Sequence, residues 1–541
     1  MIRILNGEVY DPINGIAGEV RNLYICDGRI SSQDAGGRTI DAAGMVVMPG
    51  GVDMHCHIAG PKVNTARKLR PEDHRAHEIA KTPLSRSGTF GSVPTTFATG
   101  YRYAMMGYTT AFDAAIPPLA ARHAHEELND TPVIDKGFFL LMGNNEFIME
   151  RIAAGEKEEV RHFAAWLLQA AKGYAIKLVN PGGVELWKSR SNAHTLDDEV
   201  TGFQITPRQI IQSLAEVSEE LSLPHPVHIH CNNLGIAGNW ETTLETMKAL
   251  EGRRGHLTHI QFHSYGGNPG ESFSSKAAEM AEYVNAHPNL SVDVGQVMFG
   301  DTTSLTGDGP LGYMLHQVTG CKWVNVDIEN EAGCGITPIE YKEKNSIHAT
   351  QWAIGLEWFL LVQDPWRVVL TTDHPNGASF TLYPRIIRLL MDREYRKEMM
   401  RNVNQKALAQ TTLPDLEREY TLNEIAIITR AGPARLLGLQ DKGHLGVGAC
   451  GDVTIYEKNA DWEKMFAAPR YVIKDGQVLI EDGHLRGETY GRTFYVSPAY
   501  DPAIEGKIRK FFDDYYTVRY ENYPVQLEHY LPRPEAIPCR V

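Results

Sequence analysis

The chain has 541 residues, which is too long for one average domain and fits a barrel with a smaller satellite domain. Hydrophobic residues make up 43% of it and charged residues 22%, as in ordinary globular enzymes. Its 53 Lys and Arg against 67 Asp and Glu give a net charge of −14, which argues against a nucleic-acid-binding protein, because phosphate binding requires clustered cations.

Targeting and membrane segments are not evident in the sequence. Glu8 and Asp11 interrupt the apolar run that a signal peptide needs. The longest apolar stretches, such as Phe138–Met142 and Trp358–Val362, are far too short to span a bilayer. Seven cysteines without CxxC pairing argue against a disulfide framework and against an iron–sulfur cluster. We therefore expect a reduced, cytoplasmic protein that contacts neither membrane nor nucleic acid.

Both ends of the chain are rich in short β-strands. Asp27-Gly28 and Asp475-Gly476 are hairpin-turn signals. The strands predicted around them are Arg3–Asn6, Asn22–Cys26, Met45–Met48, Asp452–Tyr456 and Tyr471–Lys474. Two β-rich segments so far apart predict one small β-sandwich domain composed of residues 1–50 and 430–496.

Between these segments, short apolar strands alternate with helices. The eight predicted strands are Val52–His57, Thr109–Ala114, Gly137–Met142, Tyr174–Val179, Pro226–Cys231, Leu257–His263, Leu290–Val294 and Arg367–Asp373. Helices such as Val160–Ala171, Pro207–Leu221 and Ser274–Ala286 separate several of them. Alternation of this kind predicts an α/β fold, a parallel (β/α)8 TIM-type barrel over residues 51–429.

Residues 497–541 form a C-terminal extension of different composition. The segment Lys510–Tyr516 is rich in Tyr and Phe, and scattered prolines follow it. One interpretation is a helix and arm packed on the chain's own surface. The other is an arm that contacts a partner subunit, since aromatic residues are enriched at interfaces.

Histidines gather at the ends of the predicted strands. His55 and His57 lie two residues apart, so on a strand both side chains point to the same face, into the barrel. Two imidazoles placed in this way can bind one divalent ion, although a single HxH pair proves little. In barrels, catalytic groups come from the C-terminal ends of several different strands. Residues at the other strand ends therefore decide whether this pair belongs to a metal site.

Three further strand ends carry residues of the same kind. His228 and His230 form a second HxH pair, and His259 and His263 are predicted to share one face of the next strand. Asp373 follows the apolar residues of the last strand. Together these ends predict a metal site in the barrel, while His228 or His263 taken singly could be a hydrogen-bonded core histidine.

Lys177 lies inside the apolar strand Tyr174–Val179, where a lysine is costly to bury unless it is paired or neutral. Burial between metal ions would lower its pKa from about 10.4. The neutral amine can then react with carbon dioxide to form an anionic carbamate whose two oxygens bridge two metals. The alternative is a core lysine paired with a nearby acid.

These strand-end residues, with the PGGVDMHCH motif at 49–57 and the KGHLGVG motif at 442–448, resemble the amidohydrolase superfamily over nearly the whole chain. Longer motifs are more specific: IAGPKVN at 58–64, RPED at 70–73, GYRYA at 100–104, VNPGG at 179–183, QFHSYGG at 261–267, DVGQ at 293–296 and REYT at 418–421. They resemble the A subunits of formylmethanofuran dehydrogenases. AGCGI at 332–336 and DHPNG at 373–377 look more like the bacterial version, the A subunits of formyltransferase/hydrolase complexes.

The resemblance implies two divalent metal ions, most commonly zinc. His55 and His57 would bind one ion, and His230 and His259 the other. Lys177, carboxylated on its side-chain nitrogen, would bridge them.

Asp373 would contact a metal and move protons as the catalytic acid–base group. Two assignments stay open, because His228 could replace His230 and His263 could replace His259. The candidates for contacts with the substrate or with the metal ligands are His228, His263, Asn233, His374, Lys62 and Arg70.

The same resemblance implies hydrolysis of an N-formyl carrier, formylmethanofuran or formylmethylofuran, to formate and the free amine within a multi-subunit complex. The alternatives are condensation of formate with the amine by the A subunit of a dehydrogenase, a cyclic amidase of the hydantoinase or dihydroorotase kind, a mononuclear deaminase, and a non-enzymatic scaffold. The basic cluster Lys62–Arg75 follows the first barrel strand, so it is either a solvated loop or a surface that steers an anionic substrate tail.

Overall fold

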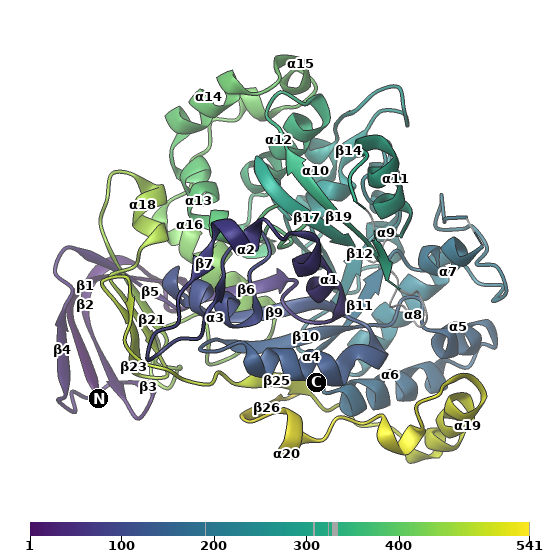
Figure 1. Cartoon of the computed structure of the whole chain (residues 1–541), viewed down its shortest axis with the longest axis horizontal. Coiled ribbons are helices and arrows are strands. Elements are labelled where there is room, and N and C mark those ends of the chain that lie inside the picture. The colour runs from purple at the N-terminus through teal and green to yellow at the C-terminus, as the bar shows by residue number, and fades with distance from the viewer. Residues whose placement is uncertain (190, 307–308, 323, 327–333, 540–541) are drawn as a thin grey trace.

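The computed structural model describes residues 1–189, 191–306, 309–322, 324–326 and 334–539, and its centre is a parallel barrel (Figure 1). Each of the eight predicted barrel strands has a counterpart, although the one predicted at Leu257–His263 lies at Gly255–Leu257 and the one predicted at Arg367–Asp373 covers only Val368–Val369. In barrel order the strands are β6 (Gly51–Cys56), β9 (Tyr108–Ile116), β10 (Asp135–Leu141), β11 (Ala175–Val179), β12 (Val227–His230), β13 (Gly255–Leu257), β16 (Leu290–Asp293) and β20 (Val368–Val369). A parallel bridge between Cys56 and His374 joins the first strand to the segment after the last.

Helices cover the outside of this barrel, as expected for a parallel sheet that is buried on both faces. The three predicted helices are present as α6 (Lys157–Ala171), α8 (Pro207–Glu220) and α10 (Ala277–Ala286). Among the described helices, none has both the length and the apolar character needed to cross a bilayer.

Strand β13 differs from the prediction. It ends at Leu257, and Ile260–His263 form a short 3₁₀ helix, so His259 and His263 do not share one strand face. The cause lies at His259, which adopts a left-handed conformation with φ +35°. Its backbone amide donates to the Asp293 carboxylate at 2.9 Å, which turns the chain away from the sheet.

A nine-stranded sheet beside the barrel forms a small β-sandwich-type domain from both ends of the chain (Figure 1). Its strands are β1 (Ile2–Asp11), β2 (Ile16–Cys26), β3 (Arg29–Ser31), β4 (Arg38–Asp41), β5 (Met45–Pro49), β21 (Val453–Glu457), β22 (Tyr471–Lys474), β23 (Gln477–Glu481) and β24 (His484–Leu485). Strands β5 and β21 pair antiparallel and join the two ends. Both predicted hairpin turns are present, with positive φ at Asp27-Gly28 and at Asp475-Gly476, as a type I′ turn requires.

Strand β25 (Thr493–Val496) lies within the segment expected to complete the β domain, yet it pairs with β10 of the barrel. The C-terminal extension continues from it through α19 (Glu505–Tyr515) to β26 (Pro534–Ile537), which pairs with β25. Tyr520 stacks on Trp166 of α6 with ring centroids 5.5 Å apart. The extension therefore packs on the chain's own barrel, and contact with a partner subunit stays a prediction.

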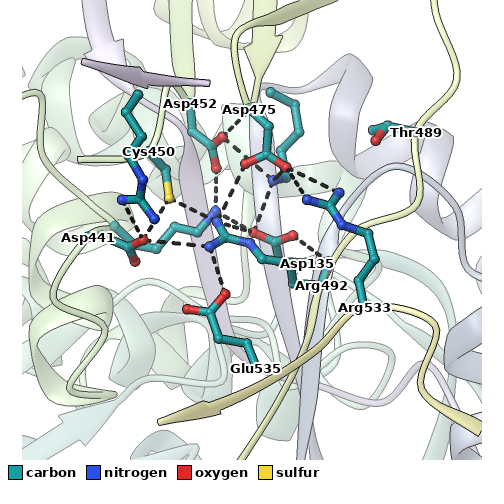
Figure 2. A network of polar contacts seen from close by, with 12 residues as sticks. Asp135, Asp441, Cys450, Asp452, Asp475, Thr489, Arg492, Arg533 and Glu535 are labelled. Atoms are coloured by element: carbon teal, nitrogen blue, oxygen red, sulfur yellow. Dashed lines mark hydrogen bonds and ion pairs between the residues drawn. The ribbon is translucent and has the colours of Figure 1, made fainter. Parts of the chain in front are cut away.

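Charged side chains meet where the β domain joins the N-terminal end of β10 (Figure 2). Asp135, the first residue of β10, is fully buried and forms ion pairs with Lys442, with Lys474 at 3.0 Å and with Arg492 at 3.3 Å. Asp452 pairs with both lysines. We call this group of five residues the floor network.

The floor network is compensated within the chain. Arg492 reaches Glu535 of β26 at 2.8 Å, and Lys474 reaches Asp475 at 2.9 Å. Burial would raise the pKa of Asp135, but the charges of Lys442, Lys474 and Arg492 hold it well below its usual range. The network therefore joins the β domain, the barrel and the C-terminal extension with charges that neutralise one another.

Candidate metal centre

His55 and His57 point into the barrel from β6 and converge on Asp373. The Nε2 atoms of His55 and His57 lie 3.0 and 3.1 Å from the same Oδ1 oxygen of Asp373. All three side chains are buried. The structure thus brings together the first strand and the residue after the last, as the barrel closure at Cys56 and His374 requires.

His230 and His259 form the second half of the centre. The Nδ1 atom of His230 lies 3.1 Å from Nε2 of His259, and the ring of His263 is 5.2 Å from each of the other two. Gly295 permits this arrangement, because a Cβ atom there would lie 2.4 Å from Cβ of His259. His259 and Asp373 both have left-handed backbones, a strain that often accumulates at functional sites.

Lys177 lies on β11 with its side chain inside the barrel. The strand register places it beside His228, which in turn lies beside His256, so the three occupy one interior layer. Its exposed fraction is 1%, and in the described part of the chain its amine has no hydrogen-bond partner. Burial lowers the pKa of Lys177 to about 7, so much of it is neutral at physiological pH.

The donor set fits metal ions. Metal–nitrogen bonds of about 2.0–2.1 Å hold tetrahedral ligand atoms about 3.4 Å apart, close to the separations found here. Side-chain nitrogens and oxygens converge in two groups that overlap at His259, one of His230, His259 and His263, the other of His55, His259 and Asp373. A third group, of His55, His228 and Asp293, shares only His55 with them. Buried nitrogens of Lys177, His259 and His263 have no hydrogen-bond partner among the described residues, which is costly unless something else binds there.

The electrostatic environment favours neutral His230 and His263 and an ionised aspartate, whereas at His55 burial is outweighed by the charges of Asp293 and Asp373, which raise the pKa to about 9. Burial, together with neighbouring positive charges, lowers the pKa values of His230 and His263 well below the usual range. Burial alone would raise the pKa of Asp373, but His259 and His55 hold it well below its usual range. Neutral imidazoles and carboxylates are the forms that bind metals.

Two aspartates were missed by the sequence analysis as parts of the site. Asp293, at the end of β16, accepts hydrogen bonds from Thr258 and Thr371 at 2.7 Å and lies 3.0 Å from Nδ1 of His55. Asp113, on β9, accepts from the amides of two residues that follow His57 and lies 3.7 Å from Nδ1 of His57. Each is the only charged residue of its barrel strand, and that was the signal available in the sequence.

Several candidate residues lie outside the converging donors. His228 lies beneath them, with Nε2 3.2 Å from Nδ1 of His55. Asn233 uses its amide nitrogen to hold the carbonyl of His194 at 2.9 Å. The ring of His374 lies 3.3 Å from the backbone nitrogen of Phe380, and its carbonyl accepts from His57.

The basic cluster follows β6 on α1 (Pro61–Leu69), where Lys62 is buried with an exposed fraction of 5%. Arg70 is surrounded by acids, at 3.2 Å from Glu72, 3.7 Å from Asp73 and 3.5 Å from Asp301. Its charge is therefore largely offset, and Lys62 is the better candidate for attracting an anion.

A cavity of about 1200 Å³ leads outward from Asp373, a size that accommodates a substantial organic ligand. Apolar side chains form much of its wall, among them Phe262, Leu311 and Ile339, with Tyr341 and Lys342 nearby. Buried ionisable groups at the base of an apolar cavity are the usual arrangement of a catalytic pocket.

Comparison with known proteins agrees with this geometry. The model of a family described as "Amidohydrolase family" matches residues 38–480. The chain belongs to the amidohydrolase family. The family and the fold together indicate a metal-binding hydrolase with a TIM-type barrel.

Two relatives match over nearly the full length. The chain is 49% identical to "Protein FwdA" of Methanocaldococcus jannaschii, with 97% of each chain covered. It is 39% identical to the A subunit of the formyltransferase/hydrolase complex Fhc of Methylorubrum extorquens, covering 95% of this chain and 94% of that one. The crystal structure of the Methylorubrum extorquens formyltransferase/hydrolase complex with methylofuran contains a chain that superposes with a TM-score of 0.94 at 37% identity, with 100% of each chain covered. The predicted resemblance is thereby confirmed.

Proposed function

We propose that this protein hydrolyses an N-formyl amine carrier of the methanofuran or methylofuran type to formate and the free amine. The observation that carries the proposal is the full-length match, at a TM-score of 0.94, to a chain of a formyltransferase/hydrolase complex that contains methylofuran. The convergence of buried histidines with Asp373, which lines a large cavity, supports it, because a formamide needs an activated water for cleavage.

In this proposal His55 and His57 hold one divalent ion, His230 and His259 hold the other, and both ions are zinc. When bound, the two ions would polarise the formyl oxygen and lower the pKa of a water molecule. Lys177, carboxylated on its side-chain nitrogen, would supply anionic oxygens to hold both ions. Its support is an unpartnered buried amine whose pKa burial lowers to about 7, because only the neutral amine reacts with carbon dioxide.

Asp373 is the proposed proton carrier. Its Oδ1 lies within 3.1 Å of His55 and His57, at the base of the cavity. It accepts one proton from the water that attacks the formyl carbon and passes it to the amine nitrogen as the C–N bond breaks. A C–O bond replaces the C–N bond, which gives formic acid and the neutral amine. The second proton of the water then passes from formic acid to the amine, and formate and the protonated amine leave. His263, whose ring nitrogens have no hydrogen-bond partner in the described part of the chain, is the proposed contact to the substrate.

We further propose that the chain works as the A subunit of a multi-subunit complex. The relative from Methylorubrum extorquens is the A subunit of such a complex, and this chain covers 94% of its length. The cysteines that the structure describes are free and do not form a cluster of metal-binding type. Any redox step coupled to this reaction would therefore take place on a different polypeptide of the complex.

The second candidate is the reverse reaction, condensation of formate with the amine, as in a formylmethanofuran dehydrogenase. The longer motifs, such as VNPGG at 179–183 and QFHSYGG at 261–267, favour it, because they resemble the A subunits of formylmethanofuran dehydrogenases. Both directions use the same groups, since the forward and reverse reactions share one transition state.

The test is to purify the protein with its native partners, determine zinc per chain, and measure formate release from N-formyl carriers. Hydantoin and dihydroorotate, substrates of cyclic amidases, and an amino-substituted nucleobase, a substrate of deaminases, should not be turned over. Formate release that fails in the Asp373→Asn variant supports the proposal, whereas turnover of a cyclic amide without formate release would replace it. About one metal ion or fewer per active chain would eliminate the dinuclear centre.

A further inference from the structure

Three buried histidines, His55, His228 and His225, form a hydrogen-bonded row next to the proposed metal centre. Of these, only His55 has a role in the proposed mechanism. Nε2 of His228 lies 3.2 Å from Nδ1 of His55. Nδ1 of His228 lies 2.9 Å from Nε2 of His225, whose own Nδ1 lies 2.8 Å from the backbone carbonyl of Leu436. All three rings have an exposed fraction of 0%. We call them the histidine column.

The carbonyl of Leu436 determines where each proton lies. A carbonyl oxygen only accepts, so Nδ1 of His225 must carry a proton and donate it. The other nitrogen of a neutral His225 is then bare and accepts from Nδ1–H of His228. The same rule leaves Nε2 of His228 bare, and that atom can only accept from Nδ1–H of His55.

The upper end of the column demands the same direction. Nδ1 of His55 also lies 3.0 Å from a carboxylate oxygen of Asp293, which again only accepts. A proton on Nδ1 of His55 can be shared between His228 and Asp293. An unprotonated Nδ1 would instead place its lone pair against the Asp293 carboxylate. Two acceptors at opposite ends of the column therefore require one and the same set of tautomers.

His225 and His228 are fully buried, and each contacts one acceptor and one donor through its two ring nitrogens, so that one proton per ring satisfies these contacts. His256 does not compete for the column, since its ring nitrogens lie 2.9 Å from Ser291 and 3.1 Å from Asp293. His225 also stacks on Phe139, with ring centroids 5.0 Å apart, which fixes its plane.

We propose that His225 and His228 are positioning residues that transmit the polarity of the Leu436 carbonyl through the barrel core, so that His55 carries its proton on Nδ1 and directs the lone pair of Nε2 toward the metal beside Asp373. The inference deepens the proposed metal centre and rests on it, but it does not depend on the identity of the substrate. It assigns a role to two histidines that bind neither metal nor substrate.

The test compares two replacements of His225 by their affinity for zinc, measured by competition with a coloured chelator. His225→Phe keeps the stacking on Phe139 but removes the acceptor that His228 needs. Its zinc affinity should fall about 10–100-fold, the usual effect of losing a partner that orients a metal-binding histidine. His225→Gln can donate to Leu436 and accept from His228, so its affinity should stay within about threefold of the original protein.

His125→Phe is the matched control. His125 is also fully buried, packs on Phe138 and lies 2.9 Å from the carbonyl of Ala171, but it has no link to the centre. It should lose thermal stability as His225→Phe does and keep its zinc affinity. Equal zinc affinity in all three variants, or an equal loss in all three, would overturn the proposal.

A measurement on the unaltered protein keeps the proposal testable if His225→Phe does not fold. With ¹⁵N-labelled histidine, the ring nitrogens of His225 and His228 should each show the proton on Nδ1. A proton on Nε2 of His228 would overturn the proposal. If zinc affinities follow the expected order while formate release is absent, the proposed substrate is wrong and the histidine column stands.

Discussion

Buried ionisable groups are paired at one end of the barrel core, whereas a buried lysine at the other end is left unpaired in the described part of the chain. At the floor network, Asp135 meets Lys442, Lys474 and Arg492, so that every cation faces an acid and the group is neutralised inside the chain. At the opposite end, Lys177 is just as buried, yet its amine has no hydrogen-bond partner among the described residues. The first arrangement needs nothing from outside, and the second is incomplete without ions or a modification.

Whether a buried polar group is paired distinguishes structural residues from functional ones more clearly than the extent of its burial does. A buried polar group that is fully paired stabilises or specifies the fold, whereas one left unpaired costs free energy that only a ligand recovers. Substitutions at the floor network should therefore change stability and leave zinc binding intact. Substitutions at the metal centre should do the reverse.

The largest effect is expected for Lys177→Met. Turnover should fall to background and zinc should be lost, because no bridging anion remains. The melting temperature of the metal-free protein should not fall, since an unpartnered buried amine is replaced by an apolar side chain of similar length. Metal analysis, formate release and calorimetry measure the three quantities.

Lys136→Met is the control for that variant. Lys136 is also buried, with its pKa lowered by burial to about 8, but its amine donates to the carbonyl of Thr131 at 2.9 Å. This control should keep zinc and turnover. Full zinc and full activity in Lys177→Met would reduce Lys177 to a core lysine.

Asp373→Asn should lower turnover about 10²–10⁴-fold, the contribution typical of a positioned acid–base group. Asparagine keeps the shape and can still accept from neighbours, so the fold and most of the metal should remain. Steady-state formate release and metal content measure the two effects. Near-normal turnover with retained zinc would assign Asp373 a purely structural role.

Lys442→Met tests the floor network. It leaves Asp135 and Asp452 with less compensation inside the protein, so the free energy of unfolding should fall by about 3–5 kcal/mol. Zinc per chain and turnover at a temperature where the variant is folded should be unchanged. Loss of zinc in the folded variant would show that the two ends of the barrel are coupled rather than independent.

The floor network also predicts how stability depends on pH. The pKa of Asp135 in the folded protein is held well below its ordinary value of 3.8. Its contribution to stability is nearly complete above about pH 5 and is lost progressively as the pH falls from there through the folded-state value. Denaturant unfolding followed from pH 7 down to about pH 2 should show this fall. Its size should shrink in Lys442→Met, because part of the charge that lowers the pKa is gone.

The smallest effect concerns Lys62, on the helix that follows the first barrel strand. Lys62→Met should raise KM for a carrier with an anionic tail a few-fold more than KM for a truncated N-formyl amine, and the difference should shrink at high salt. Lys68→Met on the same helix, at an exposed position, is the control and should change neither. An equal, salt-independent effect on both substrates would make Lys62 a structural residue of α1.

The sequence by itself determined the features that depend on local pattern. The barrel strands follow from apolar runs separated by helices, both hairpin turns from Asp-Gly pairs, and the inward direction of His55 and His57 from the two-residue period of a strand. Asp373 could be placed at a strand end because the residues before it are apolar. None of these inferences requires knowledge of a partner distant in the chain.

Only the tertiary structure decided which distant groups meet. Asp293 draws the His259 amide out of the sheet, which turns the expected strand into a 3₁₀ helix, so that His259 and His263 converge on His230 from a turn and not from one strand face. Closure of the barrel brings Asp373 beside His55, although more than 300 positions separate them in the chain. Local periodicity specifies the face on which a side chain lies, whereas the partner across a closed barrel depends on the register of every strand between them.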